Sequence, residues 1–188
     1  MARFTAIFDA NILYSVAITD IVMETALAGI FRARWSGDIH DEWIRNLKKN
    51  RTDLDSAKID RRRAVMDKAI PDALITDYKP LIDGLDLPDP KDRHVLAAAI
   101  SGSADVIVTR NTKDFPEDKV SPFGIEVQHP DTFLIHQRGL NEHLFLQCLR
   151  TCRRRLKRKN SPEEYLAGLA AAELVVLAAE LEKIKGLL

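Results

Sequence analysis

The middle of the sequence predicts a helix that is followed, after a short break, by a buried strand. An alanine-rich helix is predicted over residues 91–101, and after a Ser-Gly-Ser break residues 105–109 (DVIVT) form a β-branched run. Similar apolar runs at residues 3–8 and 125–128 are also predicted as strands. Strands that alternate with helices predict an α/β fold around a central, mostly parallel sheet.

Further elements are predicted between the first strand and the alanine-rich helix. Apolar residues at helical spacing predict a helix over residues 12–33, and a charged amphipathic segment predicts another over residues 53–70. Between them, Ser36 is expected to cap a helix that continues to residue 47. A second short strand is expected near residues 74–75 or near residues 81–82.

The sequence changes character after residue 138. Residues 140–159 predict a helix that becomes strongly basic, and Ser161-Pro-Glu-Glu predicts the start of another helix. Apolar residues from Leu174 to Leu188 repeat at spacings of three and four, and this seam is expected to dock on the rest of the chain. We therefore predict an α/β domain over residues 1–138 and a helical C-terminal appendage over residues 139–188.

The composition excludes several classes of protein. A chain of 188 residues can bury a core without disulfides, and its 28 Lys and Arg equal its 28 Asp and Glu, so bulk positive charge does not bind it to nucleic acid. The first residues lack the features of a signal peptide, and no apolar run is long enough to predict a membrane span. With Cys148 and Cys152 as its only cysteines, the chain is expected in the reducing cytoplasm.

Acidic and amide side chains follow the predicted strands or lie in the predicted helices. Asp9 follows the first strand, and Asn111 and Asp114 follow the strand at residues 105–109. The carboxyl ends of parallel strands meet in one crevice, where these side chains are expected to meet Glu42 and Asp92. Carboxylates gathered in this way repel one another unless a cation offsets their charge. Oxygen donors without a His or Cys cluster indicate Mg²⁺ or Mn²⁺, which suits phosphodiester hydrolysis.

Four segments resemble, in order and spacing, the signatures of the PIN-domain ribonucleases: FDANIL (8–13), DEWIRNL (41–47), DPKDRHVLAAAI (89–100) and DVIVTRNTKDF (105–115). The resemblance covers about residues 3–135, and its nearest branch is the VapC-type toxins of bacterial toxin–antitoxin pairs. It implies a PIN-like three-layer α/β/α fold and endoribonuclease activity that depends on Mg²⁺ or Mn²⁺. It also implies an RNA substrate, an antitoxin partner and a homodimer.

The resemblance also implies the metal-binding and catalytic carboxylates, which are Asp9, Glu42, Asp92 and Asp114. Two of these assignments have a competitor nearby in the sequence. Asp41 competes with Glu42, and Asp89 competes with Asp92. The resemblance alone leaves both choices open.

Three further residues match supporting positions of the family. Asn11 lies in the first motif, and Thr109 provides the hydroxyl at the end of a strand. Asn111 is a departure, because many members have Asp there. Either Asp114 supplies the missing carboxylate or the Asn111 amide holds a metal-bound water. The site therefore holds either one ion or two.

A strongly basic run lies between Arg150 and Lys159, where seven of ten residues are Lys or Arg and none is acidic. Such a run is typical either of a solvated helix end or of a surface that binds phosphates. No aromatic residue interrupts it, so contact is expected with the RNA backbone rather than with bases. The residues predicted to contact RNA are Arg153, Arg154, Arg155, Lys157 and Arg158.

Two other functions compete with the nuclease. The chain could be a non-catalytic RNA- or protein-binding module that retains the PIN fold, which the lost acid at Asn111 favours. A phosphatase on a similar sheet is weaker, because Asp9-Ala-Asn11 lacks the second acid two residues on that a phospho-aspartate enzyme would use.

Overall fold

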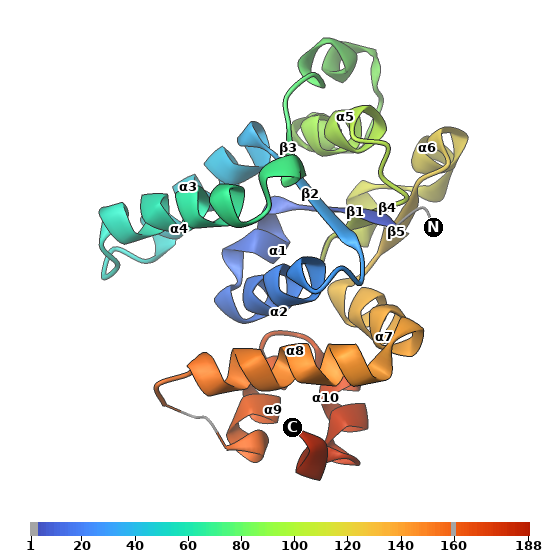
Figure 1. Ribbon diagram of the computed structural model, residues 1–188. Helices are drawn as coiled ribbons and strands as arrows, with labels where there is room; N and C mark the ends of the chain where they lie inside the picture. The colour runs from blue at the N-terminus through green and yellow to red at the C-terminus, as the bar shows by residue number, and fades with distance from the viewer. Residues whose placement is uncertain (1–3, 159–160) are drawn as a thin grey trace.

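The computed structural model describes residues 4–158 and 161–188 (Figure 1). Within these residues, five strands form one sheet in the order β3-β2-β1-β4-β5, and every neighbouring pair is parallel. The strands are β1 (Thr5–Phe8), β2 (Arg32–Ser36), β3 (Leu74–Ile75), β4 (Val106–Val108) and β5 (Glu126–Gln128). The predicted α/β class with a parallel central sheet is confirmed.

Helices connect the strands and make up the C-terminal part of the chain. Those of the first half are α1 (Ala10–Tyr14), α2 (Val16–Leu27), α3 (Gly37–Asn50), α4 (Ser56–Ala69) and α5 (Arg93–Ser101). Those of the second half are α6 (Glu117–Val120), α7 (Pro130–Leu140), α8 (Glu142–Arg155), α9 (Pro162–Ala171) and α10 (Val175–Glu182). Short 3₁₀ helices occupy Pro71–Ala73, Lys79–Gly84, Pro90–Asp92, Thr112–Asp114, Ser121–Phe123 and Lys185–Leu187.

The strand order creates a crevice beside the first strand. From β1 the chain moves outward to β2 and β3, and it then returns to the other side of β1 to form β4 and β5. The direction of winding therefore reverses between β1 and β4. In open parallel sheets this reversal is the place where ligands bind, just beyond the carboxyl ends of the strands.

Helices cover both faces of the sheet, with α5 above it and α2 and α7 below it in the view of Figure 1. Three aromatic rings fasten α7 to the sheet. Phe133 of α7 lies with its ring centroid 5.6 Å from that of Phe8 in β1 and 5.0 Å from that of Phe31. All three side chains are buried, so this cluster joins the two halves of the chain through the apolar core.

Several local predictions are confirmed. Ser36 caps α3 by accepting a hydrogen bond from the backbone N–H of Ile39 at 3.2 Å. Ser161 caps α9 with the reciprocal capping box that the Ser-Pro-Glu-Glu start predicts. Of the two alternatives for the short strand, residues 74–75 form β3, whereas residues 81–82 lie in a 3₁₀ helix.

The single helix predicted over residues 12–33 is wrong: it is two helices, α1 and α2, that meet at Ser15, and the second ends at Leu27. Gly29 then adopts a positive φ of 80° and the chain enters β2. This strand has the sequence RARWS, and its two arginines keep it from reading as an apolar run. The helix-spaced apolar pattern continued through Ile30 and Phe31 because both pack on the core from the connection.

The C-terminal part contains more helices than predicted. Helix α7 was not predicted from the sequence, and the single helix expected after Ser161 is two helices, α9 and α10, separated by residues 172–174. The predicted seam is buried at Leu174, Leu177 and Leu181, and α10 packs against α7 and α9. Helix α8 ends at Arg155, earlier than predicted, and Lys159 lies outside the described residues. The boundary at residue 138 remains a prediction.

None of the helices in the described residues has the length and apolar character needed to cross a membrane.

Candidate active site

Two neighbouring strands place Asp9 and Thr109 in the crevice. Asp9 directly follows β1 and caps α1, accepting a hydrogen bond from the Ala10 N–H at 2.6 Å. Thr109 follows β4, and its hydroxyl donates to Asp9 Oδ2 at 2.7 Å. Both residues are buried, and Asp9 is 5% exposed. The ends of β1 and β4 thus bring together two residues that are 100 positions apart in the sequence.

Asn11 ties this pair to the segment that follows β4. Its Nδ2 donates to Asp9 Oδ2 at 2.5 Å and to Thr109 Oγ1 at 2.9 Å. Its Oδ1 accepts from the backbone N–H of Arg110 at 3.1 Å. Both the nitrogen and the oxygen of the amide are engaged within the site, so Asn11 fixes the orientation of the Asp9 carboxylate.

Helix α3 brings a second carboxylate to the crevice. Glu42 Oε2 lies 3.2 Å from His94 Nε2 on α5, and the Glu42 side chain is 30% exposed. Its neighbour Asp41 forms an ion pair at 2.6 Å with Arg63 of α4, with its side chain 62% exposed. The two competing acids therefore point to different partners, and Glu42 is the one directed toward α5.

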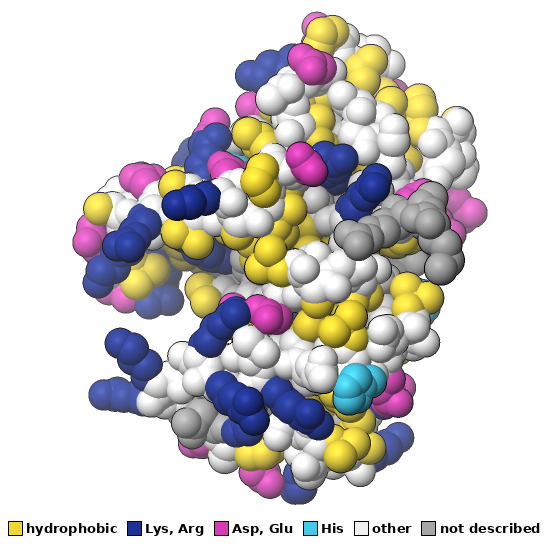
Figure 2. All heavy atoms as spheres, viewed as in Figure 1, with side chains coloured by type: hydrophobic (Ala, Val, Ile, Leu, Met, Phe, Trp, Pro, Cys, Tyr) yellow, Lys and Arg dark blue, Asp and Glu magenta, His cyan; other side chains and the backbone are white. Residues whose placement is uncertain are grey.

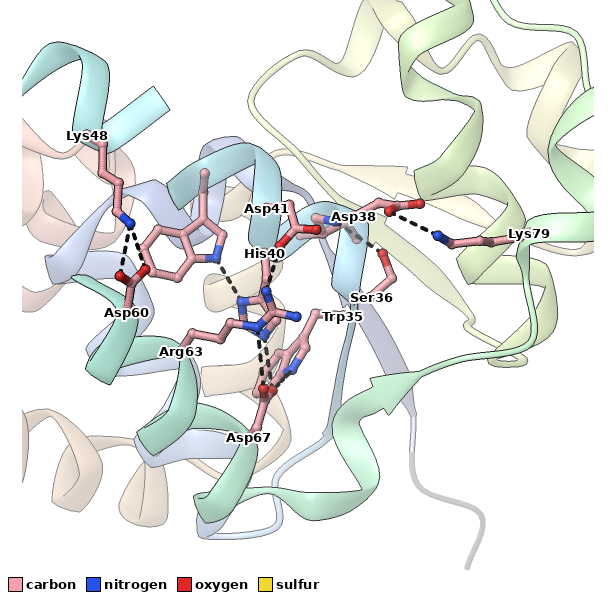
Figure 3. Close-up of polar contacts among 12 residues, drawn as sticks. Trp35, Ser36, Asp38, His40, Asp41, Lys48, Asp60, Arg63, Asp67 and Lys79 are labelled. Atoms are coloured by element: carbon pink, nitrogen blue, oxygen red, sulfur yellow. Dashed lines mark hydrogen bonds and ion pairs between the residues drawn. The ribbon is translucent and has the colours of Figure 1, made fainter. Parts of the chain in front are cut away.

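A buried polar network holds α3 in place (Figure 3). Trp43 Nε1 donates to His40 Nδ1 at 2.9 Å, and His40 Nε2 lies 3.1 Å from Asp67 Oδ1 on α4. Asp67 also accepts from Trp35 Nε1 of β2 at 2.8 Å. Because Nδ1 of His40 accepts a hydrogen bond, its ring is neutral with the proton on Nε2. Burial accordingly lowers the pKa of His40, opposed by the attraction of Asp67.

The turn before α5 contributes Asp92. Asp92 stands at the N-terminus of α5 but makes no side-chain capping bond there. Asp89 does cap its own turn, accepting from the Lys91 N–H at 2.9 Å, and it is exposed. Of these two competitors, Asp92 is therefore the one whose carboxylate is not used in a capping hydrogen bond.

The electrostatic environment of Asp92 is strongly negative. Burial and the carboxylates of Asp9, Asp114, Asp89 and Glu42 raise its pKa from the ordinary value of 3.8 to about 7. The four carboxylates named here all act to disfavour the ionised form of Asp92. The pKa of Asp9 is also raised, mainly by burial and also by Glu42. The charges of all four predicted ligands are thus coupled through space.

The segment after β4 contributes Asn111 and Asp114. The Asn111 N–H donates to Thr109 Oγ1 at 3.0 Å, and its exposed side chain makes no capping bond to the 3₁₀ helix that follows. Asp114, at the end of that helix, is half-buried and acts on Asp92. The backbone N–H of Asn111 therefore helps to hold the Thr109 hydroxyl in the site, while the Asn111 side chain does not cap the helix beside it.

The donors suit a hard divalent cation in kind, because they are oxygen atoms whose negative charges repel one another. As the side chains lie, however, no three His, Cys, Asp or Glu residues within 4–158 and 161–188 form a metal-binding group. The carboxylates are thus a loose cluster of oxygen donors rather than a closed set of ligands.

The basic run divides into two parts. Arg155 pairs with Glu24 at 2.7 Å and with Asp20 at 3.6 Å, so it fastens α8 to α2. Arg153 donates to the Leu188 carbonyl at 3.4 Å. The remaining predicted RNA contacts are exposed: Arg154, Lys157 and Arg158. Figure 2 shows Lys and Arg side chains over the C-terminal helices on the lower part of this face.

Sequence reasoning missed Arg110, whose side chain contacts the connection between α9 and α10. Arg110 Nη2 donates to the Ala172 carbonyl at 3.2 Å, and its Nε lies 3.1 Å from Glu173 Oε2. The position of Arg110 between Thr109 and Asn111 could have marked it as a candidate site residue. No local pattern in the sequence, however, predicts its contacts with Ala172 and Glu173.

The sequence matches the PIN-domain family over residues 5–113. The chain belongs to this family. A second match, described as the VapC50 C-terminal domain, covers residues 130–183. The family predicted from the four segments, and its VapC branch, are therefore confirmed.

Among curated proteins, the chain is similar to a Mycobacterium tuberculosis (strain ATCC 25618 / H37Rv) protein named "Putative ribonuclease VapC50". The two are 56% identical over 52 residues, which is 28% of this chain and 31% of that protein. The similarity thus spans less than a third of the relative's length. No solved structure is significantly similar to the chain.

Proposed function

We propose that this PIN-domain protein is a divalent-metal-dependent endoribonuclease. The observation that carries the proposal is the cluster of mutually repelling carboxylates at the reversal point of the sheet, with the pKa of Asp92 raised to about 7. Such a cluster opposes folding unless it serves a cation. The name of the similar mycobacterial protein also supports RNA as the substrate.

Asp9, Glu42, Asp92 and Asp114 would hold the ion, and their oxygen atoms suit Mg²⁺ or Mn²⁺. When bound, such an ion lowers the pKa of a coordinated water and stabilises charge on the phosphate. The chain's own residues orient the ligands: Asn11 and Thr109 fix the carboxylate of Asp9, and His94 lies against that of Glu42. This arrangement holds two ligands in place before the ion arrives.

The partners of the protein follow from the same proposal. The exposed cations Arg154, Lys157 and Arg158, with Arg153 and Arg155 beside them, would attract the RNA backbone to a site that is itself acidic. The match to a VapC50 C-terminal domain supports membership of the VapC branch. The resemblance to that branch implies an antitoxin partner and a homodimer. RNA as substrate and two buried free cysteines suit the cytoplasm.

The test is cleavage of a panel of structured RNAs by purified protein with Mg²⁺, Mn²⁺ or EDTA. Asp92→Asn and Glu42→Gln should abolish cleavage. The matched controls Asp89→Asn and Asp41→Asn should retain it, because Asp89 caps its own turn and Asp41 pairs with Arg63. If a control variant loses activity while its ligand variant keeps it, the ligand assignment is wrong.

The same experiment distinguishes the alternative of a non-catalytic binding module. The exposed amide at Asn111, where the resemblance to the family implies a carboxylate, favours that alternative. RNA that is bound but left intact in every metal would establish it and refute the nuclease. A steep dependence of that binding on salt would identify the basic run as the binding surface.

A further inference from the structure

The turn between α9 and α10 contains a residue in an unfavourable backbone conformation. Glu173 has a φ of 70°, in the left-handed region that glycine occupies at the ends of helices. A side chain with a Cβ is sterically disfavoured in this region. Residues persist in this conformation only where the surrounding structure holds them there.

The side chain of Glu173 is directed at Arg110. Its Oε2 lies 3.1 Å from Arg110 Nε, which makes an ion pair without hydrogen-bond geometry. The neighbouring Ala172 carbonyl accepts from Arg110 Nη2 at 3.2 Å. The Arg110 side chain is 23% exposed, so most of it is covered. Two consecutive residues of the turn thus hold one arginine.

The backbone of Arg110 belongs to the candidate active site. Its N–H donates to Asn11 Oδ1, and Asn11 in turn donates to Asp9 and Thr109. The next residue, Asn111, donates its N–H to Thr109 Oγ1. The contact with Glu173 therefore fixes the segment that orients Asp9 and that leads to Asp114.

We infer that Glu173 and Arg110 are positioning residues through which the C-terminal helices hold the catalytic segment after β4. The inference rests on the proposed nuclease function and adds a role for the C-terminal helices in it. An exposed ion pair contributes little to stability, and Glu173 is 59% exposed. Its role is therefore to fix geometry, and small displacements of a catalytic group reduce rates by about 10- to 100-fold.

The decisive variant is Glu173→Gly. Glycine suits the left-handed conformation, so the variant should unfold at the same urea concentration as the wild type or a higher one. Removing the carboxylate should nevertheless lower kcat for RNA cleavage by about 10- to 100-fold with little change in KM. Glu173→Asp keeps the charge, and Asp tolerates this conformation better than most residues, so it should restore part of the rate.

A second readout does not depend on activity. Hydrogen exchange of the metal-free, full-length protein should be faster at the backbone amides of Arg110 and Asn111 in Glu173→Gly, because both amides donate within the site. The matched control is Glu180→Gln, which removes an ion pair of 3.0 Å between α10 and Arg138 of α7. This control should leave both kcat and the exchange at these amides unchanged.

The outcomes separate the two proposals. If the wild type does not cleave RNA, the proposed function fails, while hydrogen exchange still tests whether Glu173 holds the segment. If the wild type cleaves and Glu173→Gly has the same kcat and exchange, the positioning role is refuted. A fall in kcat that merely parallels a loss of folded protein also refutes it. A lower kcat in a stably folded variant, with faster exchange at Arg110 and Asn111, supports it.

Discussion

Replacing Asp92 with Asn should make the metal-free protein more stable while it removes the proposed activity. Burial and neighbouring carboxylates raise the pKa of Asp92 from 3.8 to about 7, which corresponds to roughly 4 kcal/mol against the ionised form. The side chain is only partly buried, so solvent screens much of this repulsion. We therefore expect the free energy of unfolding to rise by about 1–2 kcal/mol at neutral pH or above.

The sign of the pH dependence follows from the raised pKa. From about pH 4 to pH 7 the folded protein retains a proton on Asp92 that the unfolded chain has released. The folded state binds more protons in this range, so the contribution of Asp92 to stability falls as the pH rises, and the penalty is complete above about pH 7. The difference between Asp92→Asn and the wild type should therefore be small near pH 4 and largest near pH 8.

The assay is urea unfolding in EDTA from pH 4 to pH 8, followed by circular dichroism. Asp89→Asn is the matched control, since it removes an exposed carboxylate from the same turn and should not reproduce the gain. Added Mg²⁺ should stabilise the wild type more than Asp92→Asn, because the ion binds the folded state through this carboxylate. Equal unfolding free energies of wild type and Asp92→Asn at pH 8 in EDTA would refute the reasoning.

Three further predictions concern other parts of the structure. His40 should titrate below pH 6.5 when followed by NMR, because burial favours its neutral form. Below about pH 6.5 the unfolded chain takes up this proton more readily than the folded protein, so stability should fall as the pH drops. Ser36→Ala removes the cap of α3 and should lower the free energy of unfolding by about 1 kcal/mol, measured by urea unfolding. Arg154→Ala with Arg158→Ala should weaken RNA binding and reduce the slope of log K against log salt by about 0.7 for each phosphate that the protein no longer neutralises; an unchanged slope would exclude both residues from the interface.

The two strands that end at the site could be predicted because their own residues are almost all apolar. Within the β-branched run 105–109 and the apolar run 3–8, β4 and β1 are buried along their whole length and lie inside the sheet, and such strands are near-continuously apolar. The strand β2 could not be predicted in this way. Like β4, it is an interior strand of the sheet, but Arg32 is exposed and Arg34 is half-buried, so its sequence is not continuously apolar.

The four acidic residues could be proposed from the sequence, but the choice between neighbouring acids could not be made. Asp41 and Glu42 are adjacent on one helix, and what separates them is an ion pair to Arg63 on α4 and a contact to His94 on α5. Both partners come from other helices, so the distinction is a property of helix packing. The same holds for the raised pKa of Asp92, which sums charges from segments far apart in the sequence.

The contact between Arg110 and Glu173 shows why the role of the C-terminal helices was the hardest to foresee. The residues around Glu173 are mostly alanine and leucine, so the break between α9 and α10 resembles the middle of a single helix. A glycine there would have marked the end of α9. Because glutamate replaces it, the feature that hides the break in the sequence is also the side chain that reaches the active-site segment. Selection for stability alone would favour glycine at this position, so the carboxylate is best explained by its contact with Arg110.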